Sequence, residues 1–204
     1  MIRTGTLQDY FDPASEAALT EQTVVDVQRA FDVLSARPDV DPARLGFIGH
    51  SWGASLGAVV AARDPRPAAS VLITGRPSWT GFLLEAADRF AGSRALVGED
   101  GWQAYLDAMA PYDAVASVGE VDADRLYLQF GTADDVVIAS HVEQWLAAIQ
   151  PGVKVDTYAG AGHALDAAAV ADRARWLADA LGLGPIADEA LEAVGLPDRP
   201  TRIP

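Results

Sequence analysis

Cysteine is absent from the sequence, lysine is nearly absent, and no apolar run is long. Without cysteine, neither a disulfide framework nor a thiolate metal site can form. The longest nearly apolar run, Gly53 to Ala62, is far shorter than the roughly 20 residues of a membrane-spanning helix. The amino end, MIRTGTLQDYFDP, also lacks the apolar core of a secretory signal. We therefore expect a cytoplasmic protein that has no contact with membranes.

Basic residues are scarce as well, and this scarcity limits the possible partners. The 204 residues include 29 acidic against 15 basic side chains, a formal net charge of -14, and Lys154 is the single lysine. The arginines are scattered instead of forming a stripe, so we expect no nucleic-acid partner. Half of the residues are hydrophobic, which is the balance of a folded globular chain with one core.

Short apolar runs alternate with helical patterns along most of the chain. Alternation of this kind predicts an α/β fold in which helices flank a mostly parallel sheet. The predicted strands are 45–48, 68–74, 125–130 and 153–158, and the predicted helices are 20–34, 51–63, 80–91, 101–109, 141–149 and 168–181. Thr20 is the expected cap of the first helix. We expect one domain over 1–183, elaborated at about 76–122, and a loosely packed tail over 184–204.

The stretch GHSWG, from Gly49 to Gly53, lies between the first predicted strand and the helix that follows it. A serine at a strand-to-helix turn projects its hydroxyl at the carboxyl edge of the sheet, and small flanking residues permit the strained backbone. This context favours Ser51 as a nucleophile. The alternative is that the glycines only allow a tight junction and that Ser51 caps the helix.

A serine nucleophile needs a neighbouring base, and the sequence offers three histidines for that role. His50 lies inside the turn, where packing or a supporting hydrogen bond is its expected task. His141 begins a predicted helix, where a solvated side chain is the ordinary interpretation. His163 follows the fourth predicted strand in GAGH, a loop whose glycines let the chain turn back over the sheet edge. We therefore predict His163 as the base.

The base in turn needs a carboxylate that fixes its orientation. The stretch GTADDVV follows the third predicted strand directly, so Asp134 and Asp135 are the candidates. Either residue could instead cap the helix that follows. Asp113, Asp122 and Asp124 precede the strand and are less well placed.

The elbow GHSWG, then GTADDVV and then GAGH resemble, in this order, the α/β-hydrolase superfamily. Within it, VVDVQRAFDVLSARPDVDPARLGFIGHSWGA is most similar to dienelactone-hydrolase-like esterases and to the catalytic domain of prolyl-oligopeptidase-type peptidases. The similarity spans roughly Thr20 to Leu183. In those families the acid commonly stands three residues after a glycine and three before a valine. The resemblance therefore implies Asp134 as the acid, through Gly131 and Val137.

The resemblance also implies what this chain lacks. Such hydrolases carry several strands before the helix that precedes the elbow, and a loop among those strands supplies one of the two oxyanion-hole amides. We expect a hydrolase shortened at its amino end, with the amide of Trp52 as one donor and no candidate for the other. The strand 45–48 would lose a neighbour, and its apolar edge would invite pairing with a second copy.

The function that these features predict is hydrolysis of a carboxylic ester by Ser51, His163 and Asp134, with no metal or organic cofactor. Two alternatives stay open: a catalytically impaired hydrolase-fold fragment or binding module, and a serine peptidase of prolyl-oligopeptidase type. A haloalkane dehalogenase is disfavoured because Ser51 stands where that chemistry uses aspartate. Five aromatic residues could line a substrate pocket: Trp52, Trp79, Phe82, Trp102 and Tyr105. The spacing of Trp102 and Tyr105 is also that of side chains that pack along one face of a helix.

Overall fold

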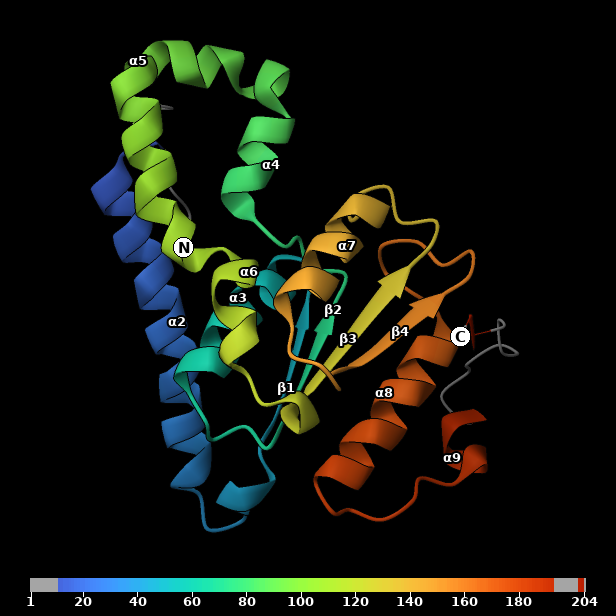
Figure 1. Cartoon of the computed structure of the whole chain (residues 1–204). Coiled ribbons are helices and arrows are strands. Elements are labelled where there is room, and N and C mark those ends of the chain that lie inside the picture. Colours follow the sequence, from blue (N-terminus) through green and yellow to red (C-terminus); the bar gives the residue numbers. More distant parts are fainter. Residues whose placement is uncertain (1–10, 193–201, 204) are drawn as a thin grey trace.

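The computed structural model describes residues 11–192 and 202–203, which contain a mostly parallel sheet with helices on both faces (Figure 1). The strands lie in chain order across the sheet; the first four run parallel, and the fifth runs antiparallel to the fourth. Their bounds are Gly46–His50 (β1), Ala69–Ile73 (β2), Leu126–Gly131 (β3), Lys154–Tyr158 (β4) and Arg202–Ile203 (β5). The predicted α/β fold class is confirmed, and each predicted strand is found within two residues of its expected position.

The register of the sheet brings the carboxyl ends of its parallel strands to one edge. His50 at the end of β1 lies opposite Ile73 at the end of β2, and Gly131 at the end of β3 lies opposite Tyr158 at the end of β4. The loops that follow these strands therefore meet in space. In parallel α/β sheets this edge is where ligands bind.

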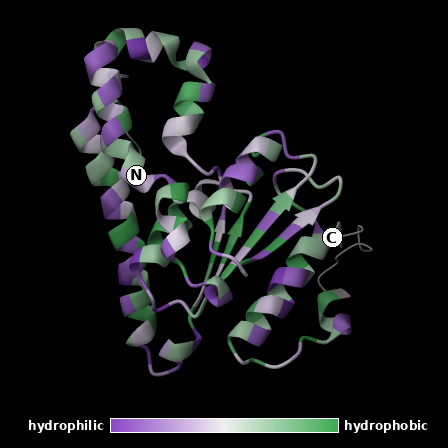
Figure 2. Ribbon diagram, viewed as in Figure 1, coloured by the Kyte–Doolittle hydropathy of each residue, from purple (hydrophilic) through white to green (hydrophobic). Residues whose placement is uncertain are grey.

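Three helices pack on one face of the sheet, and their apolar side chains form the largest core cluster. These helices are α3 (Trp52–Arg63), α6 (Ala114–Ser117) and α7 (Ala139–Ala148). In β2, Leu72 faces this cluster, whereas Val71 and Ile73 face the opposite side. Successive side chains of a strand point to opposite faces, so a strand covered on both faces is largely apolar; in β2 only Ser70 is polar. In Figure 2, β2 is mostly hydrophobic, whereas β3 and β4 also contain hydrophilic segments.

Helix α8 (Ala167–Ala180) covers the opposite face, where Trp176 and Leu177 pack against Val71, Ile73 and Tyr127. The helix begins with Asp166, whose carboxylate accepts a hydrogen bond from the Ala169 amide at 3.0 Å. Carboxylate caps of this kind satisfy an amide that has no partner inside the helix. The remaining short elements are α9 (Asp188–Glu192) and four 3₁₀ turns at Pro42–Arg44, Ala110–Tyr112, Val118–Glu120 and Ala123–Arg125.

The first helix of the described residues, α2, starts earlier than the sequence pattern indicated. It spans Pro13–Ser35, and its cap is Asp12, which accepts a hydrogen bond from the Ser15 amide at 2.8 Å. Thr20 is buried in the middle of this helix, so the prediction that it caps the helix is wrong. The Asp-Pro pair at 12 and 13 is the better start signal, because proline suits the first helical position.

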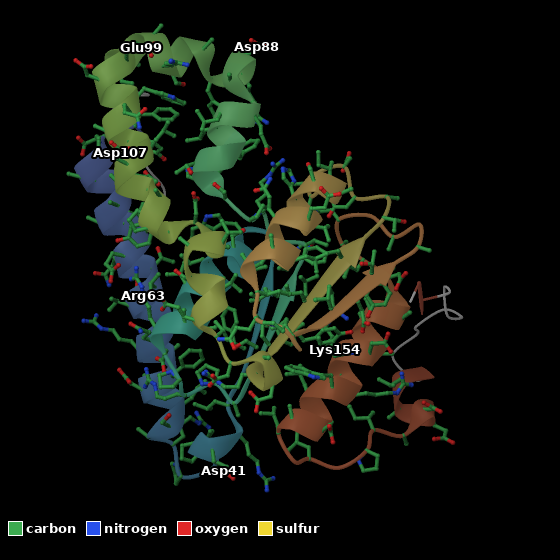
Figure 3. All side chains as sticks on the ribbon, in the orientation of Figure 1. Asp41, Arg63, Asp88, Glu99, Asp107 and Lys154 are labelled. Atoms are coloured by element: carbon green, nitrogen blue, oxygen red, sulfur yellow. The ribbon has the colours of Figure 1, made fainter. Side chains whose placement is uncertain are left out.

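Three helices occupy the long connection between β2 and β3, since the short α6 follows the two that the helical patterns predicted there. The predicted helix 80–91 is divided at Ala86, whose backbone is not helical. Helix α4 (Trp79–Glu85) leads into α5 (Ala87–Met109), and together they extend beyond the sheet as an arm whose second half returns alongside α2 (Figure 1). Labelled acidic side chains at Asp88, Glu99 and Asp107 lie around this arm (Figure 3). Its inner side is an aromatic cluster that includes Trp102 and Tyr105.

Two further features concern the edges and the end of the chain. Within the described residues, β1 pairs only with β2, so its other edge is unpaired there, and Ile48 is 54% exposed. No helix in the described part is both long enough and apolar enough to cross a bilayer. Much of the tail expected to pack loosely, residues 193–201 and 204, lies outside the described residues.

Candidate active site

Ser51 stands at a sharp turn between β1 and α3. Its backbone has φ 56° and ψ -121°, a positive φ that a residue with a side chain rarely adopts. The turn is held because the Ser51 amide donates to the carbonyl of Ile73 on the neighbouring strand at 2.9 Å, while the Ser51 carbonyl accepts the amides of Ala54 and Ser55. The hydroxyl therefore projects at the carboxyl edge of the sheet instead of capping the helix, since its side chain makes no cap hydrogen bond.

Gly49 is required by the close approach of the helix to the strand. A Cβ atom at this position would lie 2.2 Å from the carbonyl oxygen of Gly53, closer than side-chain atoms come to backbone. A Cβ atom at Gly53, by contrast, would meet nothing within 4 Å. The first glycine of the elbow is therefore a steric necessity, whereas the described surroundings of the second leave room for a side chain.

The structure brings the three predicted site residues together. The Nε2 atom of His163 lies 2.9 Å from Ser51 Oγ, and its Nδ1 atom lies 2.9 Å from Asp134 Oδ2. An ionised carboxylate can only accept, so Nδ1 carries the proton and donates it to Asp134. Nε2 is then the acceptor of the Ser51 hydroxyl proton. This is the arrangement in which imidazole can act as a general base toward serine.

Asp134 is oriented by its own loop as well as by His163. Its side chain is fully buried, and Oδ1 accepts the amides of Val136 at 2.7 Å and Val137 at 2.9 Å. Burial raises the pKa of Asp134, but the hydrogen bonds from Val137, His163 and Val136 outweigh it, and the net pKa lies below the ordinary 3.8. Asp134 is therefore ionised at neutral pH. The rival Asp135 is exposed, so the structure distinguishes the two candidates.

The loop that carries His163 is fastened through its backbone carbonyl. That oxygen accepts a hydrogen bond from Thr74 Oγ1 at 2.8 Å and lies 2.9 Å from His50 Nε2. Because a carbonyl only accepts, His50 donates through Nε2. The expected supporting role of His50 is confirmed. Thr74 was missed from the sequence, although its place directly after β2, at the shared strand edge, is the signal that could have identified it.

Trp52 begins α3, directly after the nucleophile. The first amides of a helix have no partner within it, so the Trp52 amide has no partner inside α3. The indole of Trp52 is 56% exposed and lines the cavity beside Ser51. The amide's role as an oxyanion donor stays a prediction.

His141 is not the solvated side chain that its place at a helix start indicated. It is buried, with 4% of its side chain exposed, and its Nδ1 accepts the Ile138 amide at 3.2 Å. Nε2 therefore carries the proton and donates to Glu85 of α4 at 2.8 Å. The contact ties the arm to α7, and a helical pattern cannot reveal it because Glu85 is 56 residues away in sequence.

A cavity of about 380 Å³ adjoins Ser51 between α2, α3 and the arm. Its lining is Glu16, Thr20, Ser51, Trp52, Ser55, Leu56, Arg76, Trp79, Met109, Tyr112, Ala114 and Val136. Trp52 and Trp79 are thus pocket residues, whereas Trp102 and Tyr105 belong to the packing stripe that their helical spacing indicated. Arg76, Tyr112 and Glu16 were not singled out from the sequence.

Asp113 fixes the wall of this cavity on the side of the arm. Its buried carboxylate accepts the amides of Trp79 at 2.6 Å and Thr80 at 3.1 Å, and also the hydroxyls of Ser78 and Thr80. Four donors on one carboxylate secure the first turn of α4. Asp113 is therefore a structural anchor of the pocket. Among the described residues, no group of three or more His, Asp or Glu side chains is placed to hold a metal.

A family model described as the prolyl oligopeptidase family matches residues 4–183 of this chain. Among curated proteins, the alpha/beta hydrolase domain-containing protein WAV2 of Arabidopsis thaliana is 25% identical over 139 residues, which are 66% of this chain and 44% of that protein. The chain thus spans less than half the length of this relative.

Solved structures share the fold at low sequence identity. Acetyl xylan esterase 1 from Thermoanaerobacterium sp. JW/SL YS485 aligns with a TM-score of 0.68 and 17% identity, over 88% of this chain and 59% of that one. A puromycin-hydrolyzing peptidase of Mycobacterium tuberculosis aligns with a TM-score of 0.58 and 22% identity, over 80% of this chain and 26% of that one. These likenesses confirm the architecture of an α/β hydrolase.

Proposed function

The chain belongs to the prolyl oligopeptidase family of α/β-hydrolase serine hydrolases, and from this premise we propose that it cleaves carboxylic esters with Ser51, His163 and Asp134. The observation that carries the proposal is the position of the His163 ring, 2.9 Å from both Ser51 Oγ and Asp134 Oδ2. The two acetyl xylan esterases among the similar structures support an ester substrate.

The first half of the reaction forms an acyl-enzyme. His163 Nε2 takes the hydroxyl proton as Ser51 Oγ attacks the ester carbonyl carbon, and the Trp52 amide donates to the oxyanion. Asp134 stays ionised and stabilises the imidazolium through Nδ1–H. When the tetrahedral intermediate collapses, the bond to the alcohol oxygen breaks and Nε2 returns the proton to that oxygen. The alcohol leaves, and the acyl group remains on Ser51.

The second half uses water in the same geometry. His163 Nε2 takes a proton from the water as its oxygen attacks the acyl carbon, and the bond to Ser51 Oγ then breaks. Ser51 recovers its proton from Nε2, and the carboxylic acid leaves. A second oxyanion donor would add about 10²- to 10³-fold to the rate. None is assigned among the described residues.

The experiment that tests this proposal is labelling with a fluorophosphonate, which reacts with an activated serine without needing a known substrate. The intact mass of the wild-type chain should rise by one label, mapped to Ser51 by peptide sequencing. Ser51→Ala and His163→Ala should remain unlabelled. Ser140→Ala, at an exposed serine of α7, is the matched control and should label fully. A folded wild-type chain without label would overturn the proposal and favour the impaired hydrolase-fold fragment.

Peptide hydrolysis is the second candidate, because the family takes its name from a peptidase and one similar structure is a puromycin-hydrolyzing peptidase. Both activities use the same acyl-enzyme and differ in the leaving group. The 4-nitrophenyl ester and the 4-nitroanilide of butyric acid offer a direct comparison. Release from the ester alone favours an esterase, whereas comparable second-order rate constants favour a peptidase.

A further inference from the structure

The cavity beside Ser51 contains a cation in an otherwise largely apolar wall. Among its lining residues, only Arg76 and Glu16 carry charge. Arg76 follows β2, on the same strand edge as the loops of Ser51 and His163. Its chemistry is not used in the proposed reaction, so its presence beside the nucleophile needs another explanation.

The backbone at Arg76 is held in place from two sides. Its carbonyl accepts a hydrogen bond from Ser55 Oγ of α3 at 2.8 Å, and the preceding carbonyl, of Gly75, accepts one from Trp145 Nε1 of α7 at 2.8 Å. The guanidinium lies over the ring of Phe82, 4.1 Å from its centroid. Such a stacked, partly buried arginine is positioned before any ligand arrives.

The guanidinium donors of Arg76 are left without a hydrogen-bond partner among the described residues. The nearest carboxylate is that of Glu85, and the N–O distance of 3.8 Å is too long for a hydrogen bond. The same Glu85 oxygen already accepts from His141 Nε2 at 2.8 Å. With 24% of its side chain exposed, Arg76 is neither well solvated nor well paired.

The electrostatics agree with this geometry. Burial lowers the pKa of Arg76 and outweighs the attraction of Glu85 and Asp134, whereas the hydrogen bonds of Asp64 and Asp32 raise the pKa of Arg66. An arginine stays protonated in proteins, so Arg76 remains a cation whose charge is incompletely balanced. A planar guanidinium in this state has the fork geometry that binds a carboxylate through two hydrogen bonds.

We propose that Arg76 binds a carboxylate of the substrate, so that the preferred ester carries a carboxylate a short chain away from the bond that is cleaved. This inference rests on the proposed function, because it places the ester carbonyl at Ser51. In a chain of net charge -14, an anionic substrate requires such a local cation.

The test compares anionic esters with neutral partners of the same shape. Monomethyl adipate places the carboxylate on the acyl side, and 4-acetoxybutanoate places it on the alcohol side. Each is compared with its carboxamide analogue by the release of methanol or acetate. For one of the two pairs, we expect kcat/KM to favour the carboxylate by about tenfold to a hundredfold, the range of a charged hydrogen bond. The pair that shows the preference identifies the side of the substrate that Arg76 binds.

Substitutions assign the preference to Arg76. Arg76→Gln should abolish it by lowering kcat/KM for the anionic ester alone, and Arg76→Lys should retain part of it. The matched control is Arg89→Gln on α5, which removes an equal charge near Arg76 but does not line the cavity. It should keep the preference. A wild-type enzyme that hydrolyses carboxylates and carboxamides equally, or an unchanged preference in a folded Arg76→Gln variant, would overturn the inference.

Equilibrium binding separates this inference from the proposed reaction. In a Ser51→Ala background, which cannot form an acyl-enzyme, titration calorimetry measures the dissociation constants of both anionic esters and their carboxamides. Tighter binding of an anionic ester that is lost on adding Arg76→Gln supports the anion site even if the wild-type enzyme hydrolyses nothing; in that case only the proposed function fails. Equal binding of carboxylate and carboxamide in both pairs overturns the anion site, whatever the hydrolysis shows.

Discussion

Ser51 combines a strained backbone with a hydroxyl in reach of a base. A residue held at φ 56° costs about 1–3 kcal/mol and persists only where neighbours fix it. Two contacts fix it here. The Ser51 amide donates a hydrogen bond to the Ile73 carbonyl of β2, and helix α3 approaches Gly49 so closely that only glycine fits at that position. The strained backbone directs the Ser51 side chain toward His163, and the proposed chemistry depends on this direction.

Asp134 gives a prediction at the residue scale that links charge to stability. Its native pKa lies below the ordinary 3.8, so its ionised form stabilises the fold above that pH and loses this contribution as the pH falls through the native value. Asp134→Asn should therefore lower the free energy of unfolding at pH 7 by about 1–3 kcal/mol. The difference from wild type should shrink as the pH is lowered below 4, in thermal unfolding followed by circular dichroism.

The same substitution should also slow the enzyme, because asparagine does not hold His163 in the required tautomer. We expect kcat to fall by about 10³- to 10⁴-fold. Asp135→Asn is the matched control: the residue is adjacent and exposed, and the change should affect neither quantity much. Equal effects of the two substitutions would contradict the assignment of Asp134.

Helix α5 illustrates how one residue shapes an element. Gly98 interrupts the helix with φ 73° and ψ 168°, a conformation that is essentially confined to glycine. Glu99, the next residue, is labelled at the corner where the arm turns back (Figure 3). Both halves of α5 then pack into the aromatic cluster, through Phe90 and Val97 before the kink and Trp102 after it. The direction of the arm, and so the wall of the cavity, depends on this break.

Gly98→Ala should destabilise the chain by about 1–3 kcal/mol through backbone strain alone, because nothing lies within 4 Å of the added methyl group. Gly92→Ala is the matched control: Gly92 lies in the same helix with the same open surroundings and no positive φ. That change should stabilise by up to about 1 kcal/mol. Urea unfolding of both variants measures the difference, and a destabilised Gly92→Ala would show that the kink is not the cause.

At the scale of the whole molecule, the edge of the sheet at β1 bears on how the chain assembles. Within the described residues no strand pairs with it, and Ile48 is 54% exposed. Unpaired apolar edges favour pairing with another strand, and two copies can meet at this edge about a two-fold axis. We propose that the chain forms a homodimer through β1.

Light scattering after gel filtration tests this proposal. The wild-type chain, of 21.5 kDa, should elute with about twice that mass at high concentration and dissociate on dilution. Ile48→Lys should give the monomer, because a charge on an edge strand opposes pairing. Leu146→Lys, at a side chain of α7 that is 50% exposed, should leave the dimer intact. A monomeric wild type at every concentration would refute the dimer.

The sequence by itself indicated where the four parallel strands and the main helices follow one another along the chain, and which three loops hold the proposed site residues. The spacing of apolar residues reveals which faces of a strand or helix are buried, and the need for glycine at position 49 arises from a contact with Gly53, four residues away. Both features depend on residues that are close together in the chain. The resemblance of three ordered motifs also chose Asp134 over Asp135. The start of α2 at Asp12 was missed because the Asp-Pro signal lies before the apolar periodicity begins.

Only the tertiary structure decided which side chains meet. His163 lies 112 residues from Ser51 and 29 from Asp134, and their contacts depend on the order and register of the parallel strands. The burial of His141 and the position of Arg76 in the cavity depend on how the arm folds back over the sheet edge. Such contacts bring together residues far apart in the chain, and local sequence patterns carry no information about their distance.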